Sequence, residues 1–402
     1  MKVFFMSTHP SQGTECARVA NKITNYLASI PGVEVVYYAF QNFKGLEIKD
    51  PFIDSRIKFY DGLELDPVSP NGFGDNGIMP ALIEETPDVL FIYNNIMVTQ
   101  SIMQKIPIEH MPSRKVLYAD IVCPFEHVEV YNELKIHNFD RIWTFLDCWK
   151  THLIDDIGFD SSVVNVLPHG IDFDRLVDIP QGEAKKLSGF DPDDFLVLNM
   201  NRNSTHEVWV STISAFLEFL KRQDMNPKIK LFCSCEIEGK GGGCNIQLTS
   251  VNECKRLGLD PNVVLNKHIF MNPQANRLTD DEVNNMYNAA DIGLNTCCGE
   301  GFGLTNSEHI YFNRPQIVSG VPALKETIGK YAHIIEPKVV QPIGVKQLHG
   351  GLIYICDPLD FTDALEHYYM NRDDKPNARE YIKEQYNWEN AYKVLDQFFR
   401  KQ

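Results

Sequence analysis

The sequence predicts an α/β protein with two doubly wound, Rossmann-like domains, each built on a parallel sheet. The chain has 402 residues, which is enough for two to three domains at roughly 150 residues each. Its 44% hydrophobic and 23% charged residues are typical of an ordinary globular chain. Short apolar runs alternate with helical patterns along the whole length, as in parallel sheets that are covered by helices.

The first series of apolar runs predicts the sheet of an amino-terminal domain at residues 1–173. We expect about six strands here, and we expect the irregular stretch 44–77 to form surface loops or a lid. The predicted strands are Lys2–Ser7, Val33–Phe40, Asp88–Tyr93, Lys115–Ala119, Arg141–Leu146 and Val163–Leu167.

A second series predicts a carboxy-terminal domain at residues 174–375, after the polar, turn-rich stretch 174–194. The final residues, 376–402, have apolar and aromatic residues at a helical period and predict closing helices that pack back on the amino-terminal domain. The predicted strands of the second domain are Phe195–Met200, Ile229–Ser234, Val263–Met271, Asp291–Thr296, Gln316–Ser319 and Leu352–Ile355.

Charge and composition exclude several classes of protein. Lys and Arg number 38 against 54 Asp and Glu, and a net charge of −16 argues against nucleic-acid binding. No apolar stretch is long enough for a membrane-spanning helix, and the amino terminus lacks the core of a signal peptide, so we expect a soluble, cytoplasmic protein. The ten cysteines form no CxxC or zinc-like pattern. The glycines at 239–243 lack the context of a phosphate-binding P-loop and predict a flexible loop.

The stretch Glu300–Ser319 carries the most chemical information. Gly301 and Gly303 permit a tight turn, and a helix that opens near Leu304 directs its free N–H groups toward an anionic ligand such as a diphosphate. Glu308 lies five residues past Gly303, about 8 Å along a helix, so the two carboxylates can contact different parts of one elongated ligand. The alternative is a tight turn with both carboxylates solvated.

This pattern resembles the E-x7-E signature of retaining GT-B glycosyltransferases, in detail those of glycosyltransferase family 4. Other matches follow in the family's order and span most of the chain: VLPHGIDF at 166–173, NMNR at 199–202, LTDDEVNNMYNAADIGL at 278–294 and YNWE near Trp388. The resemblance implies the GT-B architecture, in which two Rossmann-like domains face a cleft. The amino-terminal domain would hold the acceptor and the carboxy-terminal domain the nucleotide-sugar donor.

The resemblance also implies roles for individual residues. Glu308 would bind the ribose, Glu300 the transferred sugar, and Arg202 the diphosphate, for which its planar charged fork is suited. The backbone near Met271 would bind the base. The remaining residues that we place at the donor site are Gly13, His169, Phe302, Gly303, Leu304 and Thr305. The alternatives stay open. Gly13 could be only a glycine in the first turn of its helix, His169 could be only a structural histidine, and Arg202 could form only a surface ion pair.

Two departures from the family pattern concern charge at the site. Many members carry a Lys five or six positions after the diphosphate Arg, where this chain has Glu207 and Val208; His206 or Lys267 could substitute for it. The family's His after the fourth strand is also absent, and Asp120 is the nearest polar group in LYADIVCPF. A carboxylate there would orient an acceptor hydroxyl or stabilise an oxocarbenium-like transition state, unless it only ends the strand.

The predicted function is therefore the transfer of a hexose, with retention, from a nucleotide diphosphate sugar to a hydroxyl of a glycan or glycoconjugate. GDP-mannose is the preferred donor, with UDP-glucose, UDP-galactose and UDP-N-acetylglucosamine open. We expect no cofactor and no metal, because the D-x-D at Asp172 and Asp174 falls in a structural turn. We expect a monomer or homodimer. The alternatives are a non-catalytic nucleotide-sugar binding module and another GT-B enzyme, such as a sugar-nucleotide epimerase or a phosphorylase.

Overall fold

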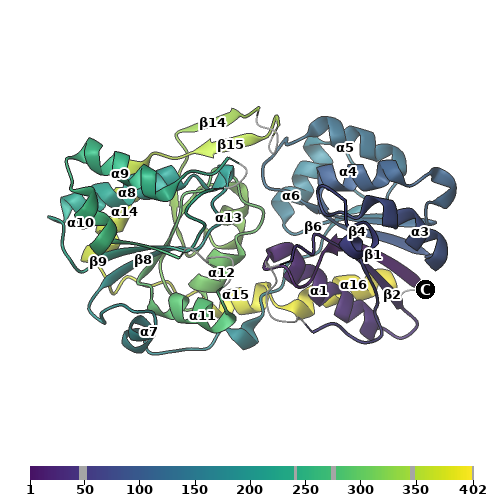
Figure 1. Ribbon diagram of the computed structural model, residues 1–402, viewed down its shortest axis with the longest axis horizontal. Coiled ribbons are helices and arrows are strands. Elements are labelled where there is room, and N and C mark those ends of the chain that lie inside the picture. The colour runs from purple at the N-terminus through teal and green to yellow at the C-terminus, as the bar shows by residue number, and fades with distance from the viewer. Residues whose placement is uncertain (45–51, 240–241, 273–277, 345–348, 401–402) are drawn as a thin grey trace. The chain divides into compact units, whose positions relative to one another are not determined.

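The computed structural model describes residues 1–44, 52–239, 242–272, 278–344 and 349–400. The chain forms two compact units (Figure 1). Unit 1 comprises Met1–Gly170, Gly344–Gly351 and Trp388–Gln402, and unit 2 comprises Ile171–Ile343 and Leu352–Asn387. Each unit has its own sheet, so the two-sheet α/β architecture predicted from the sequence is confirmed.

Unit 1 is built on a seven-stranded sheet in the order β3-β2-β1-β4-β5-β6-β7. All its strand pairs are parallel. The strand order reverses between β1 and β4, which is the place where open α/β sheets bind ligands at the carboxyl ends of their strands. The strands are β1 Lys2–Thr8, β2 Glu34–Phe40, β3 Lys58–Asp61, β4 Val89–Asn95, β5 Arg114–Asp120, β6 Arg141–Thr144 and β7 Val164–Val166.

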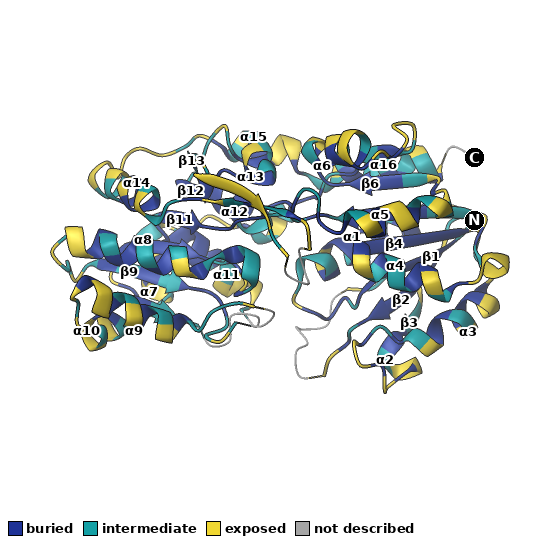
Figure 2. Ribbon diagram, turned by 90° about the horizontal axis from the view of Figure 1, so that it is seen from above, coloured by how far each residue is buried: buried dark blue, intermediate teal, exposed yellow. Residues whose placement is uncertain are grey.

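The helices of unit 1 expose polar side chains and bury apolar ones, whereas the central strands are almost wholly buried (Figure 2). The first helix begins at a regular cap, where the Thr14 side chain accepts from the backbone N–H of Ala17. The helices are α1 Glu15–Ser29, α2 Gly62–Leu65, α3 Asp75–Glu85, α4 Ile96–Lys105, α5 Val128–Leu134, α6 Asp147–Thr151 and α16 Trp388–Phe399.

Unit 2 is built on a six-stranded parallel sheet in the order β10-β9-β8-β11-β12-β13. Its strand order reverses between β8 and β11. A separate antiparallel pair, β14 and β15, also belongs to this unit. The strands are β8 Phe195–Asn199, β9 Ile229–Cys233, β10 Ile269–Met271, β11 Ile292–Asn295, β12 Gln316–Ser319, β13 His333–Ile335, β14 Val339–Pro342 and β15 Leu352–Ile355.

The core of unit 2 joins the buried sides of α8, α9 and α14 to β8, β9 and β11. Helix α11 begins at a capping box, in which Thr279 and Glu282 each bond to the other's backbone. The helices are α7 Gln181–Leu187, α8 Trp209–Arg222, α9 Ile246–Leu257, α10 Pro261–Lys267, α11 Asp280–Ala289, α12 Leu304–Ile310, α13 Pro322–Thr327, α14 Pro358–Met370 and α15 Arg379–Gln385.

Three sequence predictions about secondary structure were wrong. The predicted strand Val263–Met271 is mostly helix α10, because Asp260 caps a helix that opens at Pro261. The predicted strand Leu352–Ile355 is not in the main sheet of unit 2, where β13 takes the sixth place. The stretch 44–77 contains β3, α2 and the start of α3 as well as loops. Of the glycine-rich stretch 239–243, residues 240–241 lie outside the described residues.

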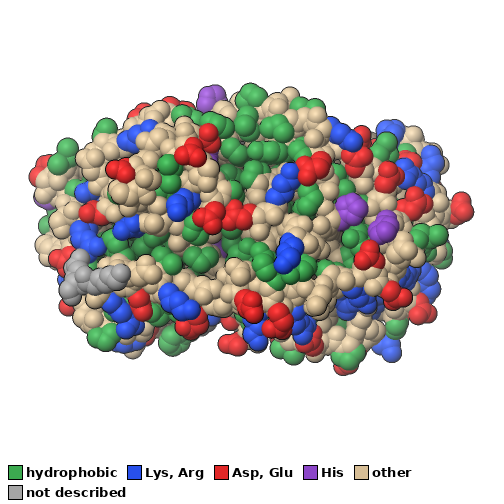
Figure 3. All heavy atoms as spheres, turned by 180° about the vertical axis from the view of Figure 1, so that it is seen from behind, with side chains coloured by type: hydrophobic (Ala, Val, Ile, Leu, Met, Phe, Trp, Pro, Cys, Tyr) green, Lys and Arg blue, Asp and Glu red, His purple; other side chains and the backbone are tan. Residues whose placement is uncertain are grey.

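Two further observations concern the surface. Of the helices in the described ranges, none combines the length and apolar character that crossing a membrane requires. Figure 3 shows Lys and Arg interspersed with Asp and Glu over one face, so the net charge of −16 is not gathered there into a single acidic area.

Candidate functional site

The predicted donor residues of unit 2 meet at the reversal of strand order in its sheet. Strands β8 and β11 are neighbours there, and both end at the same edge. The loop after β8 carries Arg202, and the loop after β11 carries Glu300. Because ligands of open α/β sheets bind outside the carboxyl ends of the strands at such a reversal, these two loops form the candidate donor site.

The glycine turn before α12 has the geometry that the sequence predicts. Gly303 is the residue before the helix and has φ 84°, a left-handed conformation that glycine adopts without strain. Glu300 is partly exposed, and its Oε1 accepts from the N–H of Gly301 at 3.1 Å. Phe302 is buried and contacts the ring of Tyr386 edge-on. The turn is therefore fixed by packing, with Glu300 on its open side.

Glu308 lies in α12 with its carboxylate held by two partners. Its Oε1 is ion-paired with Arg175, and its Oε2 accepts from the Tyr287 hydroxyl at 3.0 Å. Glu308 is 4% exposed. Arg175 also pairs with Asp280 at 2.8 Å. Burial acts to lower the pKa of Arg175, but the interactions with Glu308, Tyr287 and Asp280 together outweigh it and the pKa is raised, so this guanidinium stays charged.

The base of α12 is anchored by buried polar side chains. Thr305 Oγ1 donates to Asn201 Oδ1 at 3.3 Å, which ties the helix to the loop after β8. Asn306 accepts from Asn295 Nδ2 at 2.7 Å, which ties it to the end of β11. Burial lowers the pKa of His309 to about 3, so this ring is neutral and stacks on Tyr287. Leu304 and Thr305 remain partly exposed at the open end of the helix.

The loop after β8 differs from the family pattern in charge and in backbone strain. Arg202 is exposed, and its carbonyl accepts from Trp209 Nε1 at 2.8 Å. Glu207 is buried, and its Oε1 lies 3.4 Å from His206 Nε2. Its Oε2 has no hydrogen-bond partner within the described ranges. Val208 has φ 47°, which a β-branched residue rarely adopts. Strain of this kind is concentrated at functional sites.

The two suggested substitutes for the missing Lys lie in different places. Lys267 precedes β10 and so lies at the edge where the strands of unit 2 begin, away from the loop that carries Arg202. It cannot serve the predicted diphosphate site. His206 lies in the same loop as Arg202. Met271 ends β10, opposite Cys233 of β9, and is therefore at the carboxyl edge.

Asp120, predicted to act on the acceptor, and Gly13, predicted for the donor site, both belong to unit 1. Asp120 ends β5 beside Asn95 of β4, and its Oδ2 lies 3.6 Å from Cys16 Sγ. Gly13 is exposed and precedes the cap of α1. Both therefore lie at the carboxyl edge of the unit 1 sheet. Nearby in the chain, burial raises the pKa of Glu126 to about 8.

His169 lies in a buried aromatic environment. It is 2% exposed, and its ring contacts those of Tyr93, Tyr118 and Phe145. Its Nδ1 lies 3.3 Å from Glu15 Oε1. These contacts are all within unit 1, and they favour the structural alternative for this histidine.

The structure thus brings Glu300, Gly303, Thr305 and Glu308 together around one turn and helix. The sequence analysis missed Arg175, Tyr287 and Asn201, which support this group. A signal existed for all three, because Asn201 and Tyr287 lie within the motifs at 199–202 and 278–294, and Arg175 lies two residues after the motif at 166–173. Among the described residues, no three or more His, Cys, Asp or Glu side chains are grouped so as to hold a metal ion.

Comparison with known proteins identifies the fold. No family model matches the sequence, and no curated protein matches it. The structure is similar to sucrose-phosphate synthase from Thermosynechococcus elongatus, with TM-score 0.68 and 12% identity over 100% of this chain and 98% of that one. For Anabaena HepE in complex with UDP and glucose, the TM-score is 0.67 and the sequence identity 10%, over 100% of both chains. For WaaG, a glycosyltransferase involved in lipopolysaccharide biosynthesis, the TM-score is 0.65 and the sequence identity 14%, over 98% of this chain and 99% of that one. The fold is the GT-B fold of these proteins.

Proposed function

We propose that this chain, whose two units have the GT-B fold, is a retaining glycosyltransferase that moves a hexose from a nucleotide diphosphate sugar to a hydroxyl acceptor. One observation carries the proposal. Glu300 and Glu308 flank a fixed glycine turn after β11, at the strand-order reversal where β8 delivers Arg202. The arrangement offers a cation for the diphosphate and two carboxylates for hydroxyl groups.

Each residue has a distinct task in this proposal. Glu308 accepts hydrogen bonds from the ribose hydroxyls, since a carboxylate oxygen can accept more than one hydrogen bond. Because it is 4% exposed, its carboxylate is positioned in advance by Arg175 and Tyr287. Arg202 stabilises the leaving diphosphate. Glu300, on the open side of the turn, orients the sugar.

The chemical step needs no covalent intermediate. The bond between the anomeric carbon and the diphosphate oxygen breaks as the acceptor oxygen bonds to the same face of the sugar. The acceptor proton passes to the leaving diphosphate oxygen, and the diphosphate takes the electron pair of the broken bond. Asp120 orients the acceptor hydroxyl. We propose that the reaction is independent of metal, with charge stabilised by Arg202 and backbone N–H groups, so a chelator is expected to leave the rate unchanged.

The identity of the donor is the finer part of the proposal. GDP-mannose is the donor that the family resemblance favours. The HepE structures contain UDP and glucose or UDP-glucose. UDP-glucose is therefore the first donor to test beside GDP-mannose. A direct test is calorimetric titration with GDP-, UDP-, ADP- and CDP-sugars beside the bare nucleotides, followed by a donor hydrolysis assay.

One variant and three observations on the wild type separate the proposal from its alternatives. Asp120→Asn should reduce transfer while donor binding and folding stay intact, whereas a binding module would bind donor and show no turnover in either form. Epimerisation of the donor sugar with no acceptor present, as distinct from its hydrolysis, would indicate an epimerase. A requirement for phosphate and a pyridoxal cofactor would indicate a phosphorylase. Absence of binding across the nucleotide panel would overturn the proposal.

A further inference from the structure

A second polar cavity lies in unit 2 at the edge of the sheet opposite the candidate donor site. Its volume is about 380 Å³, within the range of small-molecule sites. Phe195 at the start of β8, Asp291 just before β11 and Pro315 just before β12 line it. Because these strands are parallel, the cavity lies where they begin, whereas Arg202 and Glu300 follow their ends. The two sites are therefore separate.

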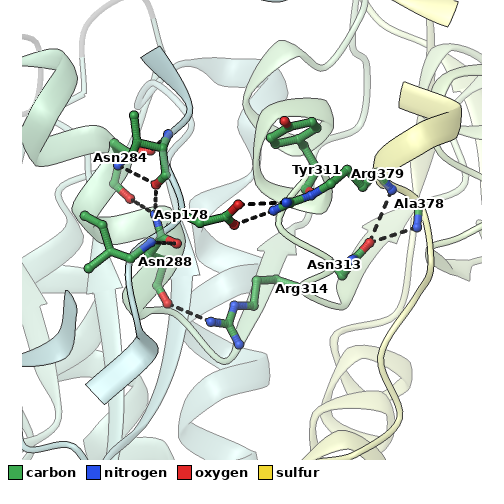
Figure 4. Close-up of polar contacts among 10 residues, drawn as sticks. Asp178, Asn284, Asn288, Tyr311, Asn313, Arg314, Ala378 and Arg379 are labelled. Atoms are coloured by element: carbon green, nitrogen blue, oxygen red, sulfur yellow. Dashed lines mark hydrogen bonds and ion pairs between the residues drawn. The ribbon is translucent and has the colours of Figure 1, made fainter. Parts of the chain in front are cut away.

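Arg314 lines this cavity as a cation without a counter-ion. Its Nη1 donates to Gln181 Oε1 at 2.9 Å. Its Nη2 donates to the carbonyl of Asn288 at 3.0 Å (Figure 4). Its Nε is buried and has no hydrogen-bond partner among the residues that the structure describes. Two of its five N–H donors are thus used, both by neutral groups. No carboxylate in the described part of the chain lies within ion-pair distance of this guanidinium.

The nearest acidic residues are already paired with other cations. Asp291 pairs with Lys185 at 2.8 Å. Asp178 faces Arg379 and is ion-paired with it, whereas Arg314 turns toward Asn288 (Figure 4). Burial lowers the pKa of Arg314, and these two more distant carboxylates only partly oppose this effect. A half-buried guanidinium whose charge is uncompensated is unfavourable unless an anion joins it.

The exposed rim of the cavity carries both signs of charge. Arg372 lies over the rings of Phe195 and Tyr369 at 5.1 and 5.0 Å, so its guanidinium is held at the rim. The other charged rim residues are Lys375, Asp193, Asp373 and Asp374. Asp374 is bonded to His367 at 3.1 Å. The acidic side chains disfavour a ligand that is anionic throughout, and they can accept hydrogen bonds from hydroxyl or amine groups.

We propose that this cavity binds a compact oxyanion that also carries hydroxyl or amine donors, with its anionic group on Arg314 and its donors on the rim carboxylates. A phosphate ester of a small polyol has this chemistry. A hydroxylated carboxylate shares it, and the two are distinguished by experiment. The site goes beyond the proposed glycosyl transfer and does not depend on it.

The test is calorimetric titration of the full chain with inorganic phosphate, glycerol 3-phosphate and glycerate, in a buffer free of oxyanions. Arg314→Gln should weaken the binding of the preferred probe by at least about tenfold, as expected for loss of a charged hydrogen bond. Arg372→Gln removes a side chain at the exposed rim that lies over the rings of Phe195 and Tyr369, and it should weaken binding several-fold in a chain that still folds. Arg256→Gln is the matched control, because Arg256 is exposed on α9 and paired with Glu253.

The outcomes decide the proposal. Tighter binding of glycerol 3-phosphate or glycerate than of inorganic phosphate, lost in both cavity variants and kept in Arg256→Gln, supports it. Binding that is lost in Arg202→Gln and kept in Arg314→Gln would place the anion at the donor site and overturn it. Equal losses in Arg256→Gln would indicate nonspecific charge attraction. Absence of binding of all three probes at millimolar concentration would also overturn it.

Discussion

Removal of Arg175 should expose how strongly the folded chain depends on the charge of Glu308. The side chains of Arg175 and Glu308 are 13% and 5% exposed, so their ion pair is a buried one. Removal of one partner of a buried pair leaves an uncompensated charge and costs about 3–5 kcal/mol. We therefore expect Arg175→Met to lower the free energy of unfolding of unit 2 by about 3–5 kcal/mol.

The matched control uses the other partner of the same arginine. Asp280 is 69% exposed, and an exposed ion pair contributes about 0–1 kcal/mol. Asp280→Asn should therefore lower the free energy of unfolding by about 1 kcal/mol. This value includes the loss of a favourable negative charge in the first turn of α11. The double variant Arg175→Met/Glu308→Gln removes both buried charges, and Tyr287 can still donate to the new amide oxygen. We expect it to be more stable than Arg175→Met alone.

The assay is urea unfolding of the full chain for the wild type, the single variants Arg175→Met, Glu308→Gln and Asp280→Asn, and the double variant. Because two compact units can unfold separately, hydrogen exchange of the α12 segment would assign the transition to unit 2. The reasoning predicts a coupling energy of about 2–3 kcal/mol between Arg175 and Glu308. Effects that add within about 0.5 kcal/mol would refute it, as would equal costs for Arg175→Met and Asp280→Asn.

Three further predictions concern the turn, the sugar and unit 1. Gly303→Ala should destabilise the chain by about 1–3 kcal/mol, measured by urea unfolding, because φ is 84° and the new Cβ would lie 2.5 Å from Leu324 Cδ2; an unchanged midpoint would contradict the strained geometry. Glu300→Gln should reduce turnover more than it reduces affinity for the bare nucleotide. Equal losses would contradict the proposal that Glu300 contacts the transferred sugar. Burial raises the pKa of Glu126 from 4.5 to about 8, so the unfolded chain loses this proton first and the stability of unit 1 should fall as pH rises from about 4.5 to 8. Glu126→Gln should flatten that part of the stability curve, and a slope identical to the wild type would show that Glu126 is ionised in the folded state.

Much of the fold could be read from the sequence because strands buried on both faces of a parallel sheet are continuous apolar runs. Gln316–Ser319 is predicted with its observed bounds for that reason. The strands of the two main sheets that were missed, β3 and β13, lie at the edges of these sheets, where burial is incomplete and the apolar signal is weak. The exposed strand β14, in the separate pair, was missed as well. The β-branched residues Val263 and Val264 suggested a strand. They lie in helix α10 instead, because the Asp260 side chain caps the start of a helix there.

The candidate site also has features that the local sequence predicts and features that depend on residues far apart in the chain. The sequence by itself determined the glycine turn, the start of α12 and the spacing of Glu300 and Glu308, since these depend on residues close together in the chain. Only the tertiary structure decided what surrounds the second carboxylate. Arg175 reaches Glu308 across 133 residues, and Arg314 is left without a counter-ion because Asp291 and Asp178 are paired elsewhere. Such pairings depend on which helices the sheet brings together, and no local pattern records them.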